Sequence, residues 1–414
     1  MKSPNLNIYV YADWHTIKEP IFIGTLLVNR VRGKELFNFE YDSTWINSTN
    51  YFLLDPSLVK FTGKQFPVGS DNFGVFFDSM PDSWGKKLMI RKAAQSNLSN
   101  SDRSIHLFDS DYLLNIFDKN RLGALRFKLD KSGDFLSNSK EFPTPPWTHT
   151  NDLQKAANDF ENNNLKNIKK WMPLLFAPGS SLGGARPKAN VLDQKNNLWI
   201  AKFPSKLDTI NKAQWEYLAY ILATEAGIIM SESKVEKIIG EHHTFFTKRF
   251  DRIGDGRIHF ASAMTMTNYN EEKLKNITAS YLDIVEFIQN NGCDIKNDLE
   301  QLWRRIVFNI SISNTDDHLR NHGFLLTEKG WKLSPAFDLN PSVDKNGLSL
   351  NIDMNNNLLD FELAKSVGSY FSLNKSQMNN IIDEVKHVVG NWKFEAKKIG
   401  ISKNEFPIMK DAFL

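Results

Sequence analysis

The sequence has a single cysteine, Cys293, among its 414 residues. One cysteine can form neither an internal disulfide nor a cysteine-built zinc site. We interpret it as a small buried thiol, because no His or Asn pattern marks it as a nucleophile. No run of 18 apolar residues occurs, and the start MKSPNLNIYVYADWH lacks the basic and apolar regions of a signal peptide. These absences predict a cytoplasmic protein with no membrane partner.

An excess of charge of one sign is also lacking. The 51 Lys and Arg residues against 48 Asp and Glu leave a net charge of +3, which does not indicate a nucleic-acid binder. With 24% charged and 41% hydrophobic residues, the composition is globular and excludes disordered, collagen-like and coiled-coil classes. The length predicts two or three domains or lobes.

Strand and helix patterns alternate along the chain, which favours an α+β class. Residues 7–50 contain strand patterns at 7–14, 20–28 and 36–41, and helical spacing begins after Pro81 with Asp82 or Ser83 as N-cap. Prolines at 143, 145 and 146 exclude a regular helix and indicate a linker. We expect further helices at 109–118, 151–170, 211–227 and 271–312, strands at 124–129, 197–204, 234–239 and 243–250, and a hairpin at 323–333.

The most informative stretch is NTDDHLRNHGFLL (314–326). Asp316 and Asn321 are five positions apart, the spacing of the catalytic Asp and the metal-binding Asn in a kinase loop. Asp338, in PAFDL, follows 22 residues after Asp316, with room for the hairpin between them. Mg²⁺ prefers such oxygen ligands. The alternative is that these are turn or cap residues, but their order around a hairpin favours a kinase.

A second constellation is PGSSLGGARPK (178–188), whose adjacent glycines let backbone amides approach phosphates. It is neither a Walker A loop nor G-x-G-x-x-G, and alone it predicts only a turn. Lys202 in WIAKFP is placed to reach the α- and β-phosphates, or is a strand-edge lysine that opposes aggregation. Glu216, fourteen residues later on the next helix, either pairs with Lys202 or lies on a solvated helix face.

Two other patterns have simpler interpretations. His318 and His322 are four residues apart, but no Glu stands between them as a metalloprotease site requires. Helical spacing assigns Trp303, Ile306, Phe308 and Ile310 to core packing.

Five motifs together resemble the HipA family of bacterial serine/threonine-protein kinase toxins of type II toxin–antitoxin systems. They are SSLGGARPK, WIAKFP, KRFDR (248–252), NTDDHLRN and LSPAFDL, and FEYDSTWI (39–46) and FFDSMPDSWG (76–85) resemble that family's N-terminal subdomain. The resemblance covers nearly the whole chain. It implies an α+β, two-lobed protein-kinase-like fold, related to phosphoinositide kinases, with an N-terminal α+β subdomain and a mostly helical C-terminal lobe. The implied domains are a HipA-like N-terminal subdomain (1–130), a linker (131–150), the rest of the N-lobe with Gly-rich loop, phosphate lysine and hinge (151–255), and a helical C-lobe with catalytic and metal-binding loops (256–414).

The resemblance also implies roles for individual residues. Asp316 is similar to the catalytic base, Asn321 and Asp338 to the Mg²⁺ ligands, and Lys202 to the phosphate-binding lysine. Ser181 aligns with a serine whose autophosphorylation ejects the phosphate loop, and the adjacent Ser180 remains the alternative. The implied ATP-binding set is Gly183, Gly184, Ala185, Arg186, Pro187, Lys188, Lys202, Lys248, Arg249, Phe250, His318, Arg320, Asn321, Phe337 and Asp338.

The implied activity is ATP- and Mg²⁺-dependent phosphorylation of a protein serine, with an aminoacyl-tRNA synthetase as one candidate target and growth arrest as the result. A HipB-like helix-turn-helix antitoxin, and operator DNA through the antitoxin complex, are the implied partners. Two alternatives stay open: a small-molecule phosphotransferase, since antibiotic kinases share the Asp-x-x-x-x-Asn loop, and a nucleotide-bound corepressor module. The full-length match argues against the first, and the intact catalytic set argues against the second.

Overall fold

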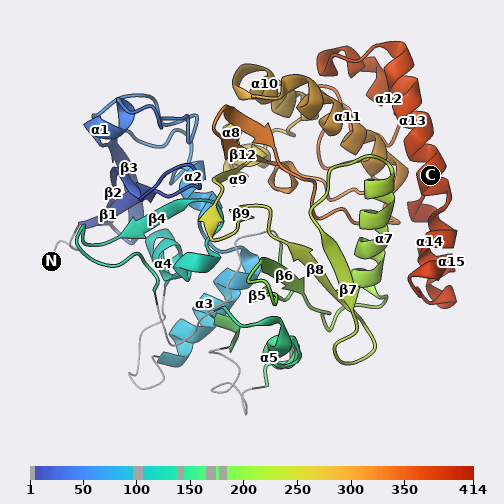
Figure 1. Cartoon of the computed structure of the whole chain (residues 1–414), viewed down its shortest axis with the longest axis horizontal. Helices are drawn as coiled ribbons and strands as arrows, with labels where there is room; N and C mark the ends of the chain where they lie inside the picture. The colour runs from blue at the N-terminus through green and yellow to red at the C-terminus, as the bar shows by residue number, and fades with distance from the viewer. Residues whose placement is uncertain (1–4, 97–105, 139–143, 165–173, 177–183) are drawn as a thin grey trace. The chain divides into compact units, whose positions relative to one another are not determined.

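The computed structural model describes residues 5–96, 106–138, 144–164, 174–176 and 184–414 (Figure 1). The chain forms two compact units. The first unit comprises Met1–Lys206 and Asp251–Ala261, and the second unit comprises Leu207–Phe250 and Ser262–Leu414.

An antiparallel sheet in the order β3-β2-β1-β4 forms the core of the N-terminal part of the first unit. The side chains of Ile8, Val10 and Ala12 are fully buried, because the two-residue period of a strand places them on one face. The strands predicted at 7–14, 20–28, 36–41 and 124–129 are confirmed. Their bounds are β1 (Leu6–Ala12), β2 (Ile21–Val31), β3 (Lys34–Tyr41) and β4 (Leu125–Lys128).

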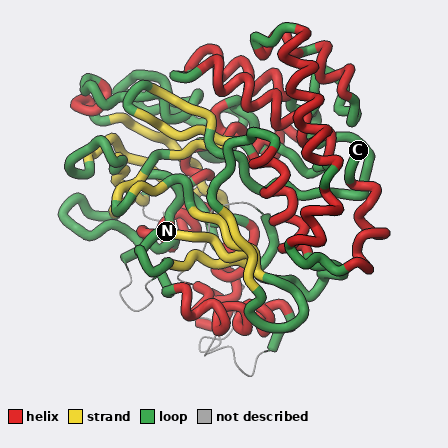
Figure 2. The backbone as a smooth tube through the Cα atoms, turned by 45° about the vertical axis from the view of Figure 1, so that its right-hand side comes forward, coloured by secondary structure: helices red, strands yellow, loops and turns green. Residues whose placement is uncertain are grey.

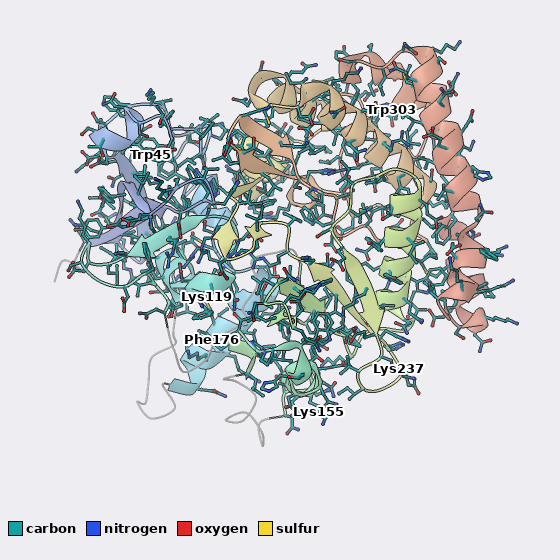
Figure 3. The ribbon with its side chains drawn as sticks, viewed as in Figure 1. Trp45, Lys119, Lys155, Phe176, Lys237 and Trp303 are labelled. Atoms are coloured by element: carbon teal, nitrogen blue, oxygen red, sulfur yellow. The ribbon has the colours of Figure 1, made fainter. Side chains whose placement is uncertain are left out.

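The first unit contains the helices α1 (Ser43–Ile46), α2 (Gly74–Asp78), α3 (Ser83–Ser96), α4 (Asp109–Asn115) and α5 (Thr150–Glu161). The predicted N-cap of α3 is confirmed, since Asp82 Oδ1 accepts a hydrogen bond from Gly85 N at 2.8 Å. The helix predicted over 151–170 is too long, because α5 ends at Glu161 and residues 162–164 are not helical. Trp45, labelled in Figure 3, is buried edge-to-face against Trp14.

Short hairpins complete the first unit. Antiparallel β5 (Lys188–Leu192) and β6 (Leu198–Lys202) pair with each other, as do β9 (Arg252–Ile253) and β10 (Gly256–Arg257). Strand β11 (Phe260–Ser262) follows where the chain passes into the second unit.

Helices dominate the second unit, and Figure 2 shows them gathered around the C-terminus. They are α7 (Lys212–Glu225), α8 (Ala263–Met266), α9 (Glu271–Leu274), α10 (Tyr281–Asn291), α11 (Ile295–Ser311), α12 (Phe361–Ser366), α13 (Lys375–Gly390), α14 (Trp392–Lys398) and α15 (Phe406–Met409). Two hairpins accompany them, β7 (Ser233–Glu236) with β8 (Thr244–Lys248), and β12 (Gly323–Thr327) with β13 (Gly330–Leu333).

Helix α11 is the central element of this unit and packs against α10, α12 and α13. The predicted core residues Trp303 (Figure 3), Ile306, Phe308 and Ile310 are all fully buried. Helix α7 confirms the helix predicted over 211–227, and Gly227 follows it with a φ of 78°, which glycine adopts without strain. Among the described helices, none has both the length and the apolar composition needed to cross a membrane.

Candidate active site

The loop that follows α11 is tightly folded. Ser313 adopts a φ of 48°, and the amide of Asn314 turns back to donate to Asn309 O at 2.8 Å. Residues Leu319–Asn321 form one turn of 3₁₀ helix, which leads directly into β12. The loop is therefore fixed at one end by α11 and at the other by the β12–β13 hairpin.

Asp316 and Asn321 meet in this loop. The side-chain amide nitrogen of Asn321 donates to the backbone carbonyl of Asp316 at 2.9 Å, while the Asp316 side chain is exposed. Because the nitrogen is used in this way, the Asn321 side-chain oxygen is left as an acceptor or a metal ligand. The two residues thus present a free carboxylate and an oriented amide oxygen from one short loop.

Asp338 lies just beyond the predicted hairpin, which the structure confirms at 323–333. Its backbone has a φ of 60°, unusual for a residue with a side chain and costing about 1–3 kcal/mol. The segment after it returns to the end of α11, where Ser342 N donates to Ile312 O at 3.3 Å. Asn340 Nδ2 donates to Asp338 Oδ1 at 3.1 Å. The carboxylate and the Asn321 oxygen are the hard oxygen donors that Mg²⁺ prefers, so these residues fit that ion.

Two aromatic side chains meet beside Asp338. The rings of Phe250, which follows β8, and Phe337 lie 5.5 Å apart between centroids, tilted by 37°. Lys248 lies at the end of β8. Its backbone carbonyl accepts a hydrogen bond from Ser231 Oγ, and its backbone amide donates one to Glu232 O. Both polar backbone groups of Lys248 therefore have partners within the second unit.

The remaining predicted residues of this unit have varied surroundings. Arg320 is exposed and forms an ion pair with Glu271. His318 is half-buried, and Arg249 is buried. Glu216, on α7, is only 7% exposed, so its interpretation as part of a solvated helix face is wrong.

In the first unit, Lys188 and Lys202 are directly opposite in the β5–β6 register. Opposite residues of an antiparallel pair project from the same face of the sheet. The exposure of Lys202 is intermediate, whereas the side chain of Lys188 is 1% exposed and its Nζ lies 2.8 Å from Asp82 Oδ2. Burial raises the pKa of Asp82, and the positive charge of Lys188 opposes that rise. The ammonium of Lys188 is thus committed to a buried ion pair.

The Gly-rich loop is described only from Gly184 onward. Gly184 has a φ of 84°, and its carbonyl accepts a hydrogen bond from Lys188 Nζ at 3.3 Å. Gly184 and Ala185 are exposed, Arg186 is half-buried, and Pro187 is buried. Ser180, Ser181 and Gly183 lie outside the described residues.

Sequence reasoning missed two aspartates near these residues. Asp82 was expected only as a helix cap, yet it also neutralises Lys188. Asp317 is buried beside Asp316 and is hydrogen-bonded to both Tyr281 and His322. His318 and His322 flank the single 3₁₀ turn Leu319–Asn321 and do not lie together on an α-helix. The adjacent aspartate pair in the sequence was the one available signal, but it does not reveal which carboxylate is buried.

Comparisons with known proteins agree with this architecture. The chain has a two-lobed, kinase-like α+β fold. A family model described as the HipA-like C-terminal domain matches residues 180–392, which is more than half of the chain. The chain belongs to the HipA family.

Solved structures extend the likeness beyond that domain. The chain resembles a protein of the Shewanella oneidensis MR-1 toxin–antitoxin complex of HipA, HipB and operator DNA, with a TM-score of 0.64 and 15% identity. That alignment covers 98% of this chain and 94% of the other. The Helicobacter pylori proinflammatory kinase CtkA matches with a TM-score of 0.39 and 17% identity, over 56% of this chain and 91% of the other. A comparison with curated proteins found no match.

Proposed function

We propose that this chain is an ATP- and Mg²⁺-dependent serine/threonine protein kinase that acts as the toxin of a toxin–antitoxin pair. The observation that carries the proposal is the hydrogen bond from the Asn321 side chain to the backbone of Asp316. It joins the exposed carboxylate that a phosphoryl transfer needs to an oriented amide oxygen suited to a metal ion. Family membership supports the same assignment.

Asp316 would orient the attacking hydroxyl group and accept its proton. Asn321 and Asp338 would hold Mg²⁺, which supplies charge neutralisation at the phosphates when bound. Lys202 and the backbone of 184–188 would bind the phosphates, and the segment 248–250 with Phe337 would hold the adenine. Catalysis would then consist mostly of positioning and electrostatic stabilisation.

The proposed partners and targets follow from family membership. A HipB-like helix-turn-helix antitoxin and, through it, operator DNA are supported by the composition of the Shewanella complex. The proposed substrate is a protein serine, with an aminoacyl-tRNA synthetase as one candidate. Autophosphorylation would fall on Ser181 or Ser180. The proposed domains are the N-terminal subdomain (1–130), the linker (131–150), the rest of the N-lobe (151–255) and the C-lobe (256–414).

The test is phosphate transfer from γ-labelled ATP by the wild type and by Asp316→Asn. We expect the variant to bind ATP and to lose about 100- to 10,000-fold in transfer rate, because its amide cannot accept the proton. Asp383→Asn, at an exposed position on α13, is the matched control and should keep full activity.

The acceptor of the label separates the proposal from its alternatives. Label on this chain or on another protein supports a protein kinase. Label only on a small molecule would support a phosphotransferase, and nucleotide binding without turnover would support a corepressor module. Undiminished transfer by Asp316→Asn would remove Asp316 from its proposed role.

A further inference from the structure

Two adjacent aspartates in the loop after α11 have opposite environments. Asp316 is exposed, whereas Asp317 is 1% exposed. An isolated buried carboxylate is costly, so it is retained only where hydrogen bonds and opposite charge compensate. The surroundings of Asp317 therefore need an explanation of their own.

One oxygen of Asp317 receives two hydrogen bonds. Tyr281 Oη, from the first turn of α10, donates to Asp317 Oδ2 at 2.5 Å, and His322 Nε2 lies 2.8 Å from the same oxygen. The rings of Tyr281 and His322 pack edge-to-face with centroids 5.7 Å apart. The carboxylate thus connects α10 to the residue that precedes β12.

The charge on this carboxylate is retained. Burial alone would raise the pKa of Asp317, but the neighbouring His322 and Tyr281 outweigh burial and lower the pKa. Arg305, fully buried on α11, adds a favourable positive charge. Asp317 is therefore a negatively charged acceptor in the interior of the second unit.

The contacts continue into the last turn of α11. Asn309 Nδ2 lies 3.5 Å from the hydroxyl oxygen of Tyr281, and Asn314 Nδ2 donates to Asn309 Oδ1 at 3.0 Å. Asn314 and Asp317 are both in the loop. The loop is consequently tied to α10 and α11 by side chains on either side of Asp316.

The proposed catalytic groups depend on this backbone. Asp316 is the immediate neighbour of Asp317, and its backbone carbonyl accepts the hydrogen bond from the Asn321 side chain. The backbone amide of Asn321 donates to His318 O at 2.8 Å. A shift of the Asp317 backbone would therefore move the Asp316 carboxylate and the Asn321 oxygen together. A misplacement of about 1 Å in such groups costs about a hundredfold in rate.

We propose that Asp317 is a positioning residue, whose buried carboxylate, held by Tyr281 and His322, fixes the loop that presents Asp316 and Asn321. The inference rests on the proposed kinase function for its catalytic consequence, but not for its structural one. Asp317 would thus position the loop, whereas Asp316 would act on the attacking hydroxyl group. Tyr281 shares this task from α10.

The experiment uses the full chain and the near-isosteric variants Asp317→Asn and Tyr281→Phe. Asp317→Asn should lower kcat for ATP-dependent transfer by about a hundredfold and change KM for ATP much less, because the proposed phosphate lysine Lys202 and the proposed adenine segment 248–250 lie outside this loop. Tyr281→Phe should cause a smaller loss of kcat. The matched control is Asp55→Asn, which alters a buried carboxylate of the first unit that accepts amide hydrogen bonds from Ser57 and Val75.

A second measurement does not need activity. Hydrogen–deuterium exchange of the backbone over 312–323 should become faster in Asp317→Asn, and should stay at the wild-type rate in Asp55→Asn. If the wild type turns over no ATP but the exchange rate rises as expected, the proposed function fails while the positioning role stands. Unchanged exchange over this loop, or an unchanged kcat in an active enzyme, would overturn the inference.

Discussion

His259 is buried in the first unit, where its ring stacks on Trp14 with centroids 5.8 Å apart and its Nδ1 lies 3.5 Å from Ala124 N. Burial lowers the pKa of His259 to about 3. The native protein therefore keeps this imidazole neutral through the range in which an unfolded chain protonates it, near pH 6.5. The consequence is a stability that depends on pH.

We expect the free energy of unfolding to fall as the pH drops below about 6.5, because the unfolded state then binds a proton that the native state does not. Below about pH 6.5, His259 alone lowers the free energy of unfolding by about 1.4 kcal/mol for each pH unit. Urea unfolding at pH 7.5 and 5.5 measures the effect. Between pH 7.5 and pH 5.5, the free energy of unfolding of His259→Gln should fall by about 1.4 kcal/mol less than that of the wild type. His387→Gln, exposed on α13, is the control, and equal pH dependence in wild type and His259→Gln would contradict the argument.

At the scale of elements, Lys188 and Asp82 join the first residue of β5 to the N-terminus of α3. Asp82 uses Oδ1 to cap α3 and Oδ2 to bind the ammonium, and Trp84 Nε1 donates to the carbonyl of Lys188 at 3.0 Å. The strand that leaves the Gly-rich loop is thereby anchored to a helix 106 positions away in sequence. Within the first unit, the start of β5 is therefore held to the start of α3.

Lys188→Met should therefore destabilise the protein by about 3–5 kcal/mol, because it leaves the Asp82 carboxylate buried and unpaired. The double variant Asp82→Asn/Lys188→Met retains the cap but buries no charge, so it should be more stable than the single variant. Denaturant unfolding of the complete double-mutant cycle measures the coupling. Lys365→Ala, which breaks the more exposed pair with Glu362, should cost far less. A double variant less stable than Lys188→Met would show that the ion pair is not the cause.

At the scale of the whole molecule, the proposed function predicts that Mg²⁺ and ATP stabilise the folded chain. A ligand that binds only the native state at 100 times its Kd adds about 2.7 kcal/mol. Thermal unfolding should show a higher Tm with Mg²⁺–ATP for the wild type, and a much smaller shift for Lys202→Ala. Lys237→Ala, in the exposed turn between β7 and β8, should keep the wild-type shift. An equal shift in all three proteins would exclude a phosphate-binding role for Lys202.

Local sequence patterns predicted much of the secondary structure. Strand alternation in 7–41, the cap before α3, the glycine after α7 and the hairpin at 323–333 all follow from the periodicity and turn chemistry of neighbouring residues. The polar segment after α5 misled the prediction, because propensity alone does not define where a surface helix ends.

By itself, the sequence determined the order of the elements and the spacing of Asp316, Asn321 and Asp338, because both depend on residues close together in the chain. Only the tertiary structure decided that Asp317 is buried while Asp316 is exposed, and that Lys188 is neutralised by Asp82. Adjacent residues of the same type look alike in a sequence. Their environments differ because burial and partner choice depend on elements that folding brings together from distant positions.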